Sequence, residues 1–349
     1  MRENIWVSIT VAILISYLTS YIVYFGFTSN YSMNYFSKDT YPNVFEKSVY
    51  KYRILSKYVL LSIDRFLDAN YPNARTTRQV LYLDKKGSQN FYQAFFYLNT
   101  FFLILTSVIA VLLLHLQNVF KTTASDRILF VFFLSILINI TQFCIVPYDT
   151  ISYFLELLTF YVFLKYFNRR YILTLLIICF LVVLATLNRE SSALTVTLII
   201  TLLLSNKGNS NESIVAMLAI ALSFLLSYLA LFFFVSSSPG IIISTALGNF
   251  KLQENWLGFL FWLLFFYLSL QLSNQFKNIK LIVLYHVISL PYILVILFTC
   301  VPWEVRLYIP IFLGSIFIAK LNEQFCNFSP KEILNQVTSP LLRRKHHQQ

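Results

Sequence analysis

Residues 171–205 read YILTLLIICFLVVLATLNRESSALTVTLIITLLLS, and this stretch decides the fold class. Its only charges, Arg189 and Glu190, lie in the polar break Asn188-Arg189-Glu190-Ser191-Ser192 near its middle. About 20 apolar residues suffice to cross a bilayer as a helix. The stretch therefore predicts two short membrane spans that meet at a polar turn, with one very long span as the alternative.

The rest of the chain has the same character. Hydrophobic residues make up 58% of the 349 residues, charged residues only 12%, and the mean hydropathy is +0.67, which excludes a soluble globule and a disordered chain. Continuous apolar runs with few glycines favour helices over a β-barrel. We predict an all-α, polytopic membrane protein with about ten spans, near 5–27, 95–118, 128–146, 150–167, 171–187, 193–205, 214–236, 256–273, 281–301 and 305–319.

The distribution of Lys and Arg predicts the orientation, because short cytoplasmic loops are enriched in both. With the N-terminus inside, the short outer loops hold only Arg189, Lys251 and Arg306. The inner segments hold fourteen basic residues: Arg2, Lys121, Arg127, Lys165, Arg169, Arg170, Lys207, Lys277, Lys280, Lys320, Lys331, Arg343, Arg344 and Lys345. Both ends are therefore expected in the cytoplasm. Residues 1–320 form one transmembrane domain, and 321–349 form a basic cytoplasmic tail.

A long outer loop, residues 28–94, separates the first two spans. Within it, apolar residues recur at three- and four-residue steps over 43–67, as Val49, Tyr52, Leu55, Val59, Ile63 and Phe66. This spacing predicts an amphipathic helix lying on the outer membrane surface. Asp39 and Glu46 precede it, either as ordinary turn and helix-start residues or as groups that project into an outer cavity.

Few ionisable residues lie at membrane depth, and each is a functional candidate because its burial in lipid is costly. Asp149 and Glu156 are seven residues apart, hence on one helix face about 10 Å apart in depth. The preceding span has Ser135, Asn139 and Gln142 at matching intervals, as a cavity lining or as hydrogen-bonding contacts between helices. The topology places Asp149, Arg189, Glu190, Glu304 and Arg306 together at the outer boundary, as an ion-pair network or as an anion-binding site.

The second interpretation implies a definite chemistry. Arginine holds phosphate through its planar fork of donors and stays charged at membrane depth. A carboxylate can take a proton from an acceptor hydroxyl as the hydroxyl attacks an activated carbon, and a lipid phosphate then leaves. With seven glycines in the chain and no phosphate-binding Gly-rich loop, a soluble nucleotide donor is not expected.

At this point the chain resembles the integral-membrane glycosyltransferases of the GT-C fold, which use polyprenyl-phosphate sugars on the extracytoplasmic face. The resemblance covers the whole architecture. It is carried locally by three segments: Tyr52-Arg53-Ile54-Leu55, Leu187-Asn188-Arg189-Glu190-Ser191-Ser192 and Glu304-Val305-Arg306-Leu307-Tyr308-Ile309-Pro310. These segments look like parts of poorly characterised bacterial proteins of this type.

The resemblance implies roles for individual residues. An acid of the first outer loop would be the catalytic base, with Asp39 the first choice and Glu46 the second, although the paired acids common in the family are absent here. Arg189 and Arg306 would hold the lipid phosphate, and Asp149, Glu190 and Glu304 would orient the sugar or the arginines. Tyr148 and Glu156 complete the predicted substrate-binding set. No cofactor is required, although some relatives use a divalent metal.

Other functions stay open. A polysaccharide polymerase or ligase also acts on lipid-linked glycans, but usually through large later loops. A lipid or solute transporter or flippase would need a site reached from both sides, and a non-catalytic membrane subunit would use the charges for assembly. The expected partners are the bilayer, a polyprenyl-phosphate-linked sugar and a glycan, lipid or protein acceptor, with no nucleic acid. The expected location is a bacterial inner membrane.

Overall fold

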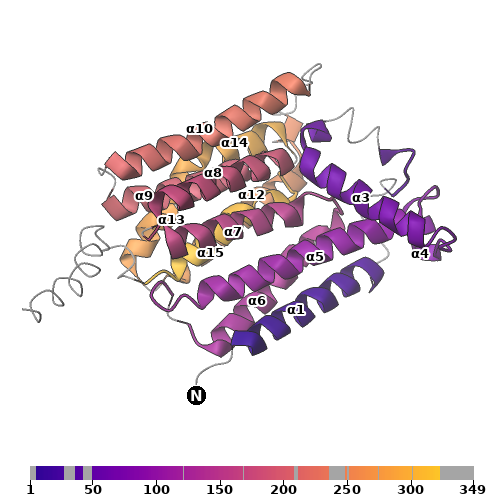
Figure 1. The fold of residues 1–349 in the computed structure, drawn as a ribbon, viewed down its shortest axis with the longest axis horizontal. Coiled ribbons are helices and arrows are strands. Elements are labelled where there is room, and N and C mark those ends of the chain that lie inside the picture. Colours follow the sequence, from indigo (N-terminus) through magenta and orange to yellow (C-terminus); the bar gives the residue numbers. More distant parts are fainter. Residues whose placement is uncertain are drawn as a thin grey trace, which may run out of the picture.

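The computed structural model describes residues 5–26, 36–41, 49–120, 122–167, 169–207, 211–235, 248–249, 251–273, 275–300 and 302–322. These residues form a helical bundle whose long helices run side by side (Figure 1). Within them the one β-type contact is an isolated bridge between Phe120 and Leu321. The predicted all-α class is confirmed.

One side of the bundle consists of α1 (Ile5–Tyr21), α5 (Gln89–Leu114) and α6 (Ala124–Ile140), with the π-helical turn η1 (Ile22–Gly26) after α1. The buried face of α1 carries small residues at four-residue steps: Ser8, Ala12, Ser16 and Ser20. Small residues let helix backbones approach closely within a membrane. Ser16 Oγ lies 2.8 Å from Ser107 Oγ of α5 and 3.2 Å from Ser135 Oγ of α6, so one hydroxyl cluster joins the three helices.

The polar side chains of α6 contact α1 and α5. Asn139 donates a hydrogen bond from Nδ2 to Thr19 Oγ1 and accepts one from Ser20 Oγ. Gln142 is buried in the following 3-10 turn η3 (Thr141–Phe143). Of the two roles considered for Ser135 and Asn139, helix association fits their contacts.

The middle of the bundle contains α7 (Asp149–Tyr166), α8 (Tyr171–Asn188), α9 (Ser192–Lys207) and α10 (Asn211–Phe234). Residues 171–205 thus form two helices, and the chain reverses direction between them. The hydroxyl of Tyr171, at the start of α8, donates to the carbonyl oxygen of Glu212, at the start of α10, at 2.7 Å. Because α9 separates these two starts, it runs back alongside α8.

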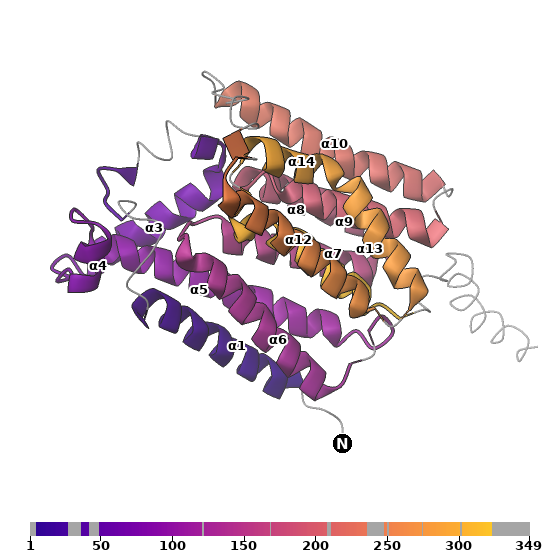
Figure 2. The same ribbon diagram turned by 180° about the vertical axis from the view of Figure 1, so that it is seen from behind.

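The opposite side contains α12 (Gln253–Gln271), α13 (Phe276–Ile288) and α14 (Leu290–Thr299), seen in front in Figure 2. α13 and α14 form a helix pair bent by 50°. The short helix α15 (Ile309–Ala319) packs against α7, α9, α12 and α13, and ten of its eleven residues are buried. Gly258 of α12 allows the loop before α15 to approach, since a Cβ there would lie 2.0 Å from the Pro302 carbonyl oxygen.

Four described helices are long and apolar enough to cross a membrane: Ile5–Gly26, Gln89–Leu114, Tyr171–Asn188 and Asn211–Phe234. The bent pair α13–α14 brings the number to five. These helices, and the many apolar side chains exposed on α10 and α12, describe a multi-pass membrane protein. Each of the ten predicted spans overlaps a helix or a helix pair, but α6, α9 and α15 have only 17, 16 and 11 residues.

The first loop contributes the 3-10 turn η2 (Val49–Tyr52), α3 (Ile54–Asn70) and α4 (Arg78–Leu83), which gather at one end of the bundle, called here the α3 end. The start of α1 lies at the other end (Figure 1). α3 packs on α5 and α8. Lys38, before the helix, forms ion pairs with Asp64 and Asp68 of α3, and Asn90 of α5 donates to Asp68 at 2.9 Å.

The predicted helix over 43–67 differs from α3 in its start and in its buried face. Residues 42–48 lie outside the described residues, and α3 begins only at Ile54. The buried face carries Ser56, Leu60, Asp64 and Leu67. The predicted apolar residues do not form this buried face, because α3 packs on α5 and α8 and not on the membrane surface as predicted. Val59, Ile63 and Phe66 instead line an outward hollow of about 400 Å³ together with Tyr58 and Ser62.

Candidate functional site

Three turns meet at the α3 end of the bundle, and each carries a charged residue. Asp149 is the first residue of α7, where a carboxylate is favoured by the positive end of the helix dipole. Arg189 follows the last residue of α8. Its backbone is extended (φ −164°, ψ 146°), so the helix ends there and the chain turns away from the helix axis. Arg306 belongs to the 3-10 turn η4 (Val305–Leu307), which Pro310 at the start of α15 follows.

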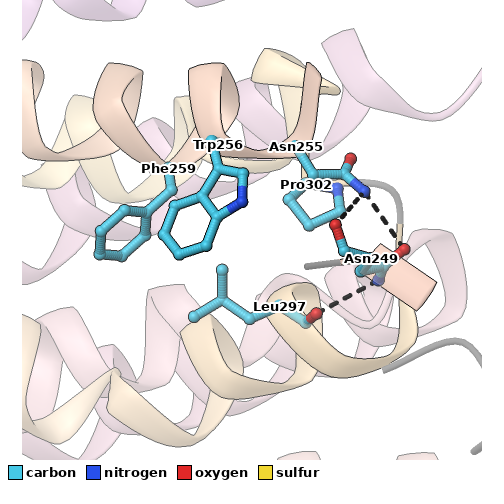
Figure 3. Close-up of a pocket in the computed structure, with 6 residues that line it drawn as sticks. All are labelled: Asn249, Asn255, Trp256, Phe259, Leu297 and Pro302. Carbon is cyan, nitrogen blue, oxygen red and sulfur yellow. Dashed lines mark hydrogen bonds between the residues drawn. The ribbon is translucent and has the colours of Figure 1, made fainter. Parts of the chain in front are cut away.

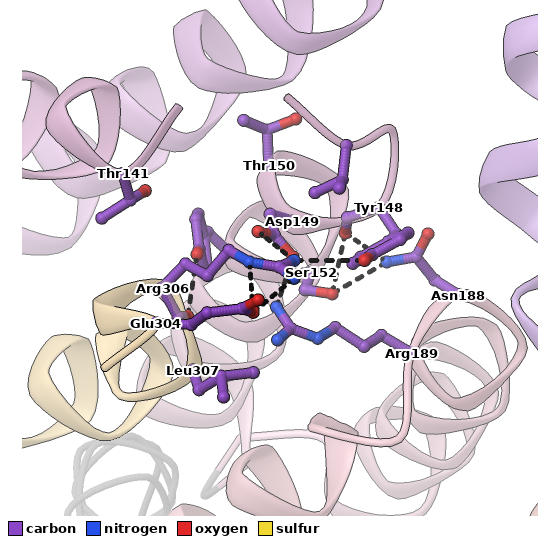
Figure 4. Close-up of polar contacts among 12 residues, drawn as sticks. Thr141, Tyr148, Asp149, Thr150, Ser152, Asn188, Arg189, Glu304, Arg306 and Leu307 are labelled. Atoms are coloured by element: carbon purple, nitrogen blue, oxygen red, sulfur yellow. Dashed lines mark hydrogen bonds and ion pairs between the residues drawn. The ribbon is translucent and has the colours of Figure 1, made fainter. Parts of the chain in front are cut away.

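Asp149 binds both arginines at once. Its Oδ1 lies 2.5 Å from Arg189 Nη1, and its Oδ2 lies 3.3 Å from Arg306 Nη1. Figure 4 shows the two guanidinium groups approaching the same carboxylate from different turns. The side chains of Asp149, Arg189 and Arg306 are 0%, 2% and 3% exposed. Such a charged group is stable away from water only because each charge is paired.

Glu304 supplies a second acid to Arg306. Its Oε2 accepts from Arg306 Nε at 3.0 Å and from Nη2 at 2.6 Å. Arg306 Nη1 also donates to the Tyr148 hydroxyl at 3.1 Å, and Tyr153 donates to the Arg306 carbonyl oxygen at 3.3 Å. Nε, Nη1 and Nη2 of Arg306 therefore each donate to a named acceptor.

A third arginine, Arg53, reaches the same place from the first loop. Its Nε and Nη2 donate to Glu190 Oε2 at 3.2 and 3.1 Å, joining the residue before α3 to the α8–α9 turn. Its guanidinium carbon lies 3.8 Å from the centre of the Tyr148 ring, while those of Arg189 and Arg306 lie 5.4 and 5.7 Å away. Three arginines thus surround one tyrosine, a cation–π arrangement that is stronger away from water.

We call these seven residues the arginine cluster: Arg53, Tyr148, Asp149, Arg189, Glu190, Glu304 and Arg306. Six of the predicted site residues belong to it. The convergence of the three turns could be anticipated from membrane depth, whereas Arg53 was predicted only as part of the Tyr52-Arg53-Ile54-Leu55 resemblance and was given no role. Nothing in the sequence around Arg53, which lies at the start of an amphipathic helix in the loop, indicated that its side chain would contact the bundle.

Of the remaining predicted residues, Asp39 and Glu156 form no hydrogen bond or ion pair with the cluster among the described residues. Asp39 is exposed in the turn before α3, where its backbone N–H donates to Ser37 Oγ at 3.2 Å. Glu46 lies outside the described residues. Glu156 is buried two turns further along α7 than Asp149, and its Oε1 has no hydrogen-bond partner in the part of the chain that the structure describes. Asp149 itself is enclosed, so the two acids do not line one open cavity.

An apolar cavity of about 280 Å³ opens between α12 and α14 at the same end of the bundle (Figure 3). Its walls are Asn249, Asn255, Trp256, Phe259, Leu297 and Pro302. The amides face the backbone: Asn249 Nδ2 donates to the carbonyl oxygens of Leu297 and Cys300, and Asn255 Nδ2 to that of Asn249. Pro302 is four residues from Arg306, a separation of at most about 14 Å along an extended chain. The cavity and the arginine cluster are therefore linked by the short segment from Pro302 to Arg306, although the residues that line the cavity do not belong to the cluster.

The chemistry available here is recognition of an anion beside an apolar chain. Guanidinium groups pair with phosphate or carboxylate through two parallel N–H donors, and the cavity that Pro302 lines has mainly apolar walls. Among the described residues, no three His, Cys, Asp or Glu side chains are grouped so as to hold a metal ion. Cys144, Cys179 and Cys300 are free thiols, and Cys326 lies outside the described residues.

Comparison with known proteins adds no assignment to this geometry. No protein-family model, curated protein or solved structure matches the chain.

Proposed function

We propose that the chain is a membrane glycosyltransferase of GT-C type that moves a sugar from a polyprenyl-phosphate donor to a glycan, lipid or protein acceptor. The observation that carries the proposal is the pairing of Arg189 and Arg306 on Asp149, at the end of a short segment whose other end, Pro302, lines an apolar cavity. An isoprenoid phosphate has the same two parts, one anionic and one apolar. In this proposal the phosphate binds the arginines and the isoprenoid chain enters the cavity between α12 and α14.

The proposed topology has ten crossings, with both termini in the cytoplasm of a bacterial cell and the α3 end outside. In this topology the short helices α6, α9 and α15 are three of the ten crossings, and the polar turns at their ends span the rest of the bilayer. The donor then reaches the arginine cluster from the outer leaflet. The acceptor approaches through the first loop, whose α3 and η2 adjoin the cluster through Arg53.

The proposed reaction is a substitution at the anomeric carbon. The acceptor hydroxyl attacks that carbon, its proton passes to a carboxylate of the first loop, and the bond from the carbon to the phosphate oxygen breaks. Arginines stabilise the negative charge that develops on the departing phosphate. Asp39 stays the first choice for the base because it is exposed and lies in the loop segment that is tied to α3 by Lys38. Glu46 stays the second.

The test is transfer of radiolabelled sugar from polyprenyl-phosphate donors in membranes that contain the protein. Arg189→Ala and Arg306→Ala are expected to abolish transfer, and Asp39→Asn to reduce it by at least a hundredfold. Arg169→Ala, at an exposed arginine of the α7–α8 turn, is the matched control and should retain full activity. Full transfer by all three site variants, at equal expression, would refute the proposal.

A further inference from the structure

The two glutamates of the arginine cluster bind their arginines in the same way. Glu190 Oε2 accepts from Nε and Nη2 of Arg53, and Glu304 Oε2 accepts from Nε and Nη2 of Arg306. In both pairs a single carboxylate oxygen occupies the whole Nε–Nη2 edge. That edge is the one with which arginine forms two parallel hydrogen bonds to a phosphate. Each glutamate thus stands where an anionic ligand would bind.

The Arg53–Glu190 pair is the one best placed for exchange. The Glu190 side chain is 32% exposed, against 10% for Glu304 and 0% for Asp149. An ion pair with one partner that contacts water is easier to open than a fully buried pair, because the exposed partner can be solvated instead. Glu190 can therefore leave Arg53 more easily than Asp149 can leave its two buried arginines, provided that another anion then pairs with Arg53.

Arg53 itself stays in position when Glu190 leaves. Its guanidinium lies 3.8 Å from the centre of the Tyr148 ring and 4.8 Å from that of Tyr50, and these two rings stack at 5.7 Å. Its Nη1 is buried and has no hydrogen-bond partner among the residues that the structure describes. A buried donor without a partner is unfavourable. An anion with several acceptor oxygens would satisfy Nη1 together with the edge now held by Glu190.

We propose that Arg53 is a third phosphate-binding arginine and that Glu190 is a displaceable occupant of its binding edge. An incoming phosphate group takes the place of the Glu190 carboxylate on Arg53. This inference rests on the proposed function, since it concerns the phosphate of the same donor. It adds a consequence for regulation: the link between η2 and the α8–α9 turn opens when the ligand binds and closes when the ligand leaves.

The experiment measures binding of farnesyl phosphate and of inorganic phosphate to the purified full-length protein in nanodiscs. Glu190→Gln removes the competing charge and is expected to lower the Kd for farnesyl phosphate about threefold to tenfold. Arg53→Ala is expected to raise that Kd at least tenfold, and Arg53→Lys nearly as much, because a lysine lacks the planar edge. The double variant Arg53→Ala/Glu190→Gln should bind like Arg53→Ala alone.

The outcomes separate this inference from the proposed function. If Arg189→Ala and Arg306→Ala lose farnesyl phosphate while Arg53→Ala keeps the wild-type Kd, or if Glu190→Gln binds no tighter, the role of Arg53 and Glu190 is refuted and the function stands. If the wild-type protein binds neither compound, both fail. Equal affinity for inorganic phosphate would identify free phosphate as the ligand. Thermal unfolding of each variant identifies any that has lost its fold.

Discussion

At the scale of single residues, the arginine cluster depends on Asp149. This carboxylate is fully buried and gives one oxygen to each of two arginines, so it neutralises charge that would otherwise be isolated from water. The three acids and three arginines of the cluster balance formally. Loss of Asp149 therefore leaves a net positive charge at a buried position, which is more costly than the loss of an exposed acid.

Asp149→Asn keeps the shape of the side chain and removes its charge. We expect the unfolding free energy to fall by about 3 kcal/mol, the usual cost of breaking a buried ion pair from one side. Thermal unfolding of the purified protein in detergent measures this loss. Glu254→Gln, at an exposed acid in the first turn of α12, is the control and should unfold like the wild type. Equal stability of the Asp149 variant would show that the cluster is hydrated.

At the scale of elements, α3 forms ion pairs through two acids, Asp64 and Asp68, whose pKa values shift in opposite directions. Hydrogen bonds from Lys38 and Asn90 lower the pKa of Asp68, whereas burial raises the pKa of Asp64 despite its contact with Lys38. Ionised Asp68 therefore stabilises the attachment of α3 above the unfolded pKa of about 4, and this contribution is lost as the pH falls through the lower folded value. Asp64 opposes it: the folded state gains stability as the pH falls through the raised pKa of Asp64.

The two acids can be compared directly by hydrogen exchange of the α3 backbone, corrected for the intrinsic rate at each pH. At pH 7, Asp68→Asn should increase exchange in α3, because it removes the favourable ionised form. Asp64→Asn should increase it less or protect α3, because the ionised form that it removes is the disfavoured one. At pH 3 the difference between Asp68→Asn and wild type should shrink. A larger effect from Asp64→Asn at pH 7 would contradict this account.

At the scale of the whole molecule, the orientation can be tested by cysteine labelling in a background without native cysteines. Lys85→Cys lies in the exposed turn after α4, and Arg170→Cys lies in the exposed turn before α8, at the other end of the bundle. We expect an impermeant maleimide to label position 85 in intact cells and position 170 only after permeabilisation. The reverse pattern would place the α3 end in the cytoplasm and remove the basis for an extracytoplasmic reaction.

The sequence predicts the helices well and their partners poorly. Apolar runs and polar breaks follow from the need to satisfy the backbone in lipid, so the positions of the bundle helices and the reversal at Arg189 could be predicted. Periodicity identified one face for Ser135 and Asn139 but not that α1 would cover it. The predicted membrane depth of Asp149, Arg189 and Arg306 indicated that all three lie at the same boundary of the bilayer. Arg53 was missed because hydropathy carries no information on how a polar loop folds over the end of a bundle.

The shortness of α15 has a consequence for biogenesis. An eleven-residue helix is about 16 Å long, roughly half the hydrocarbon thickness, so it cannot insert into a bilayer as an independent segment. It enters by docking among α7, α9, α12 and α13, which must already be in the membrane. Arg306 directly precedes it and arrives with it. A nascent chain therefore holds Asp149 and Arg189 before their third partner, and the arginine cluster is complete only when this late helix has been captured.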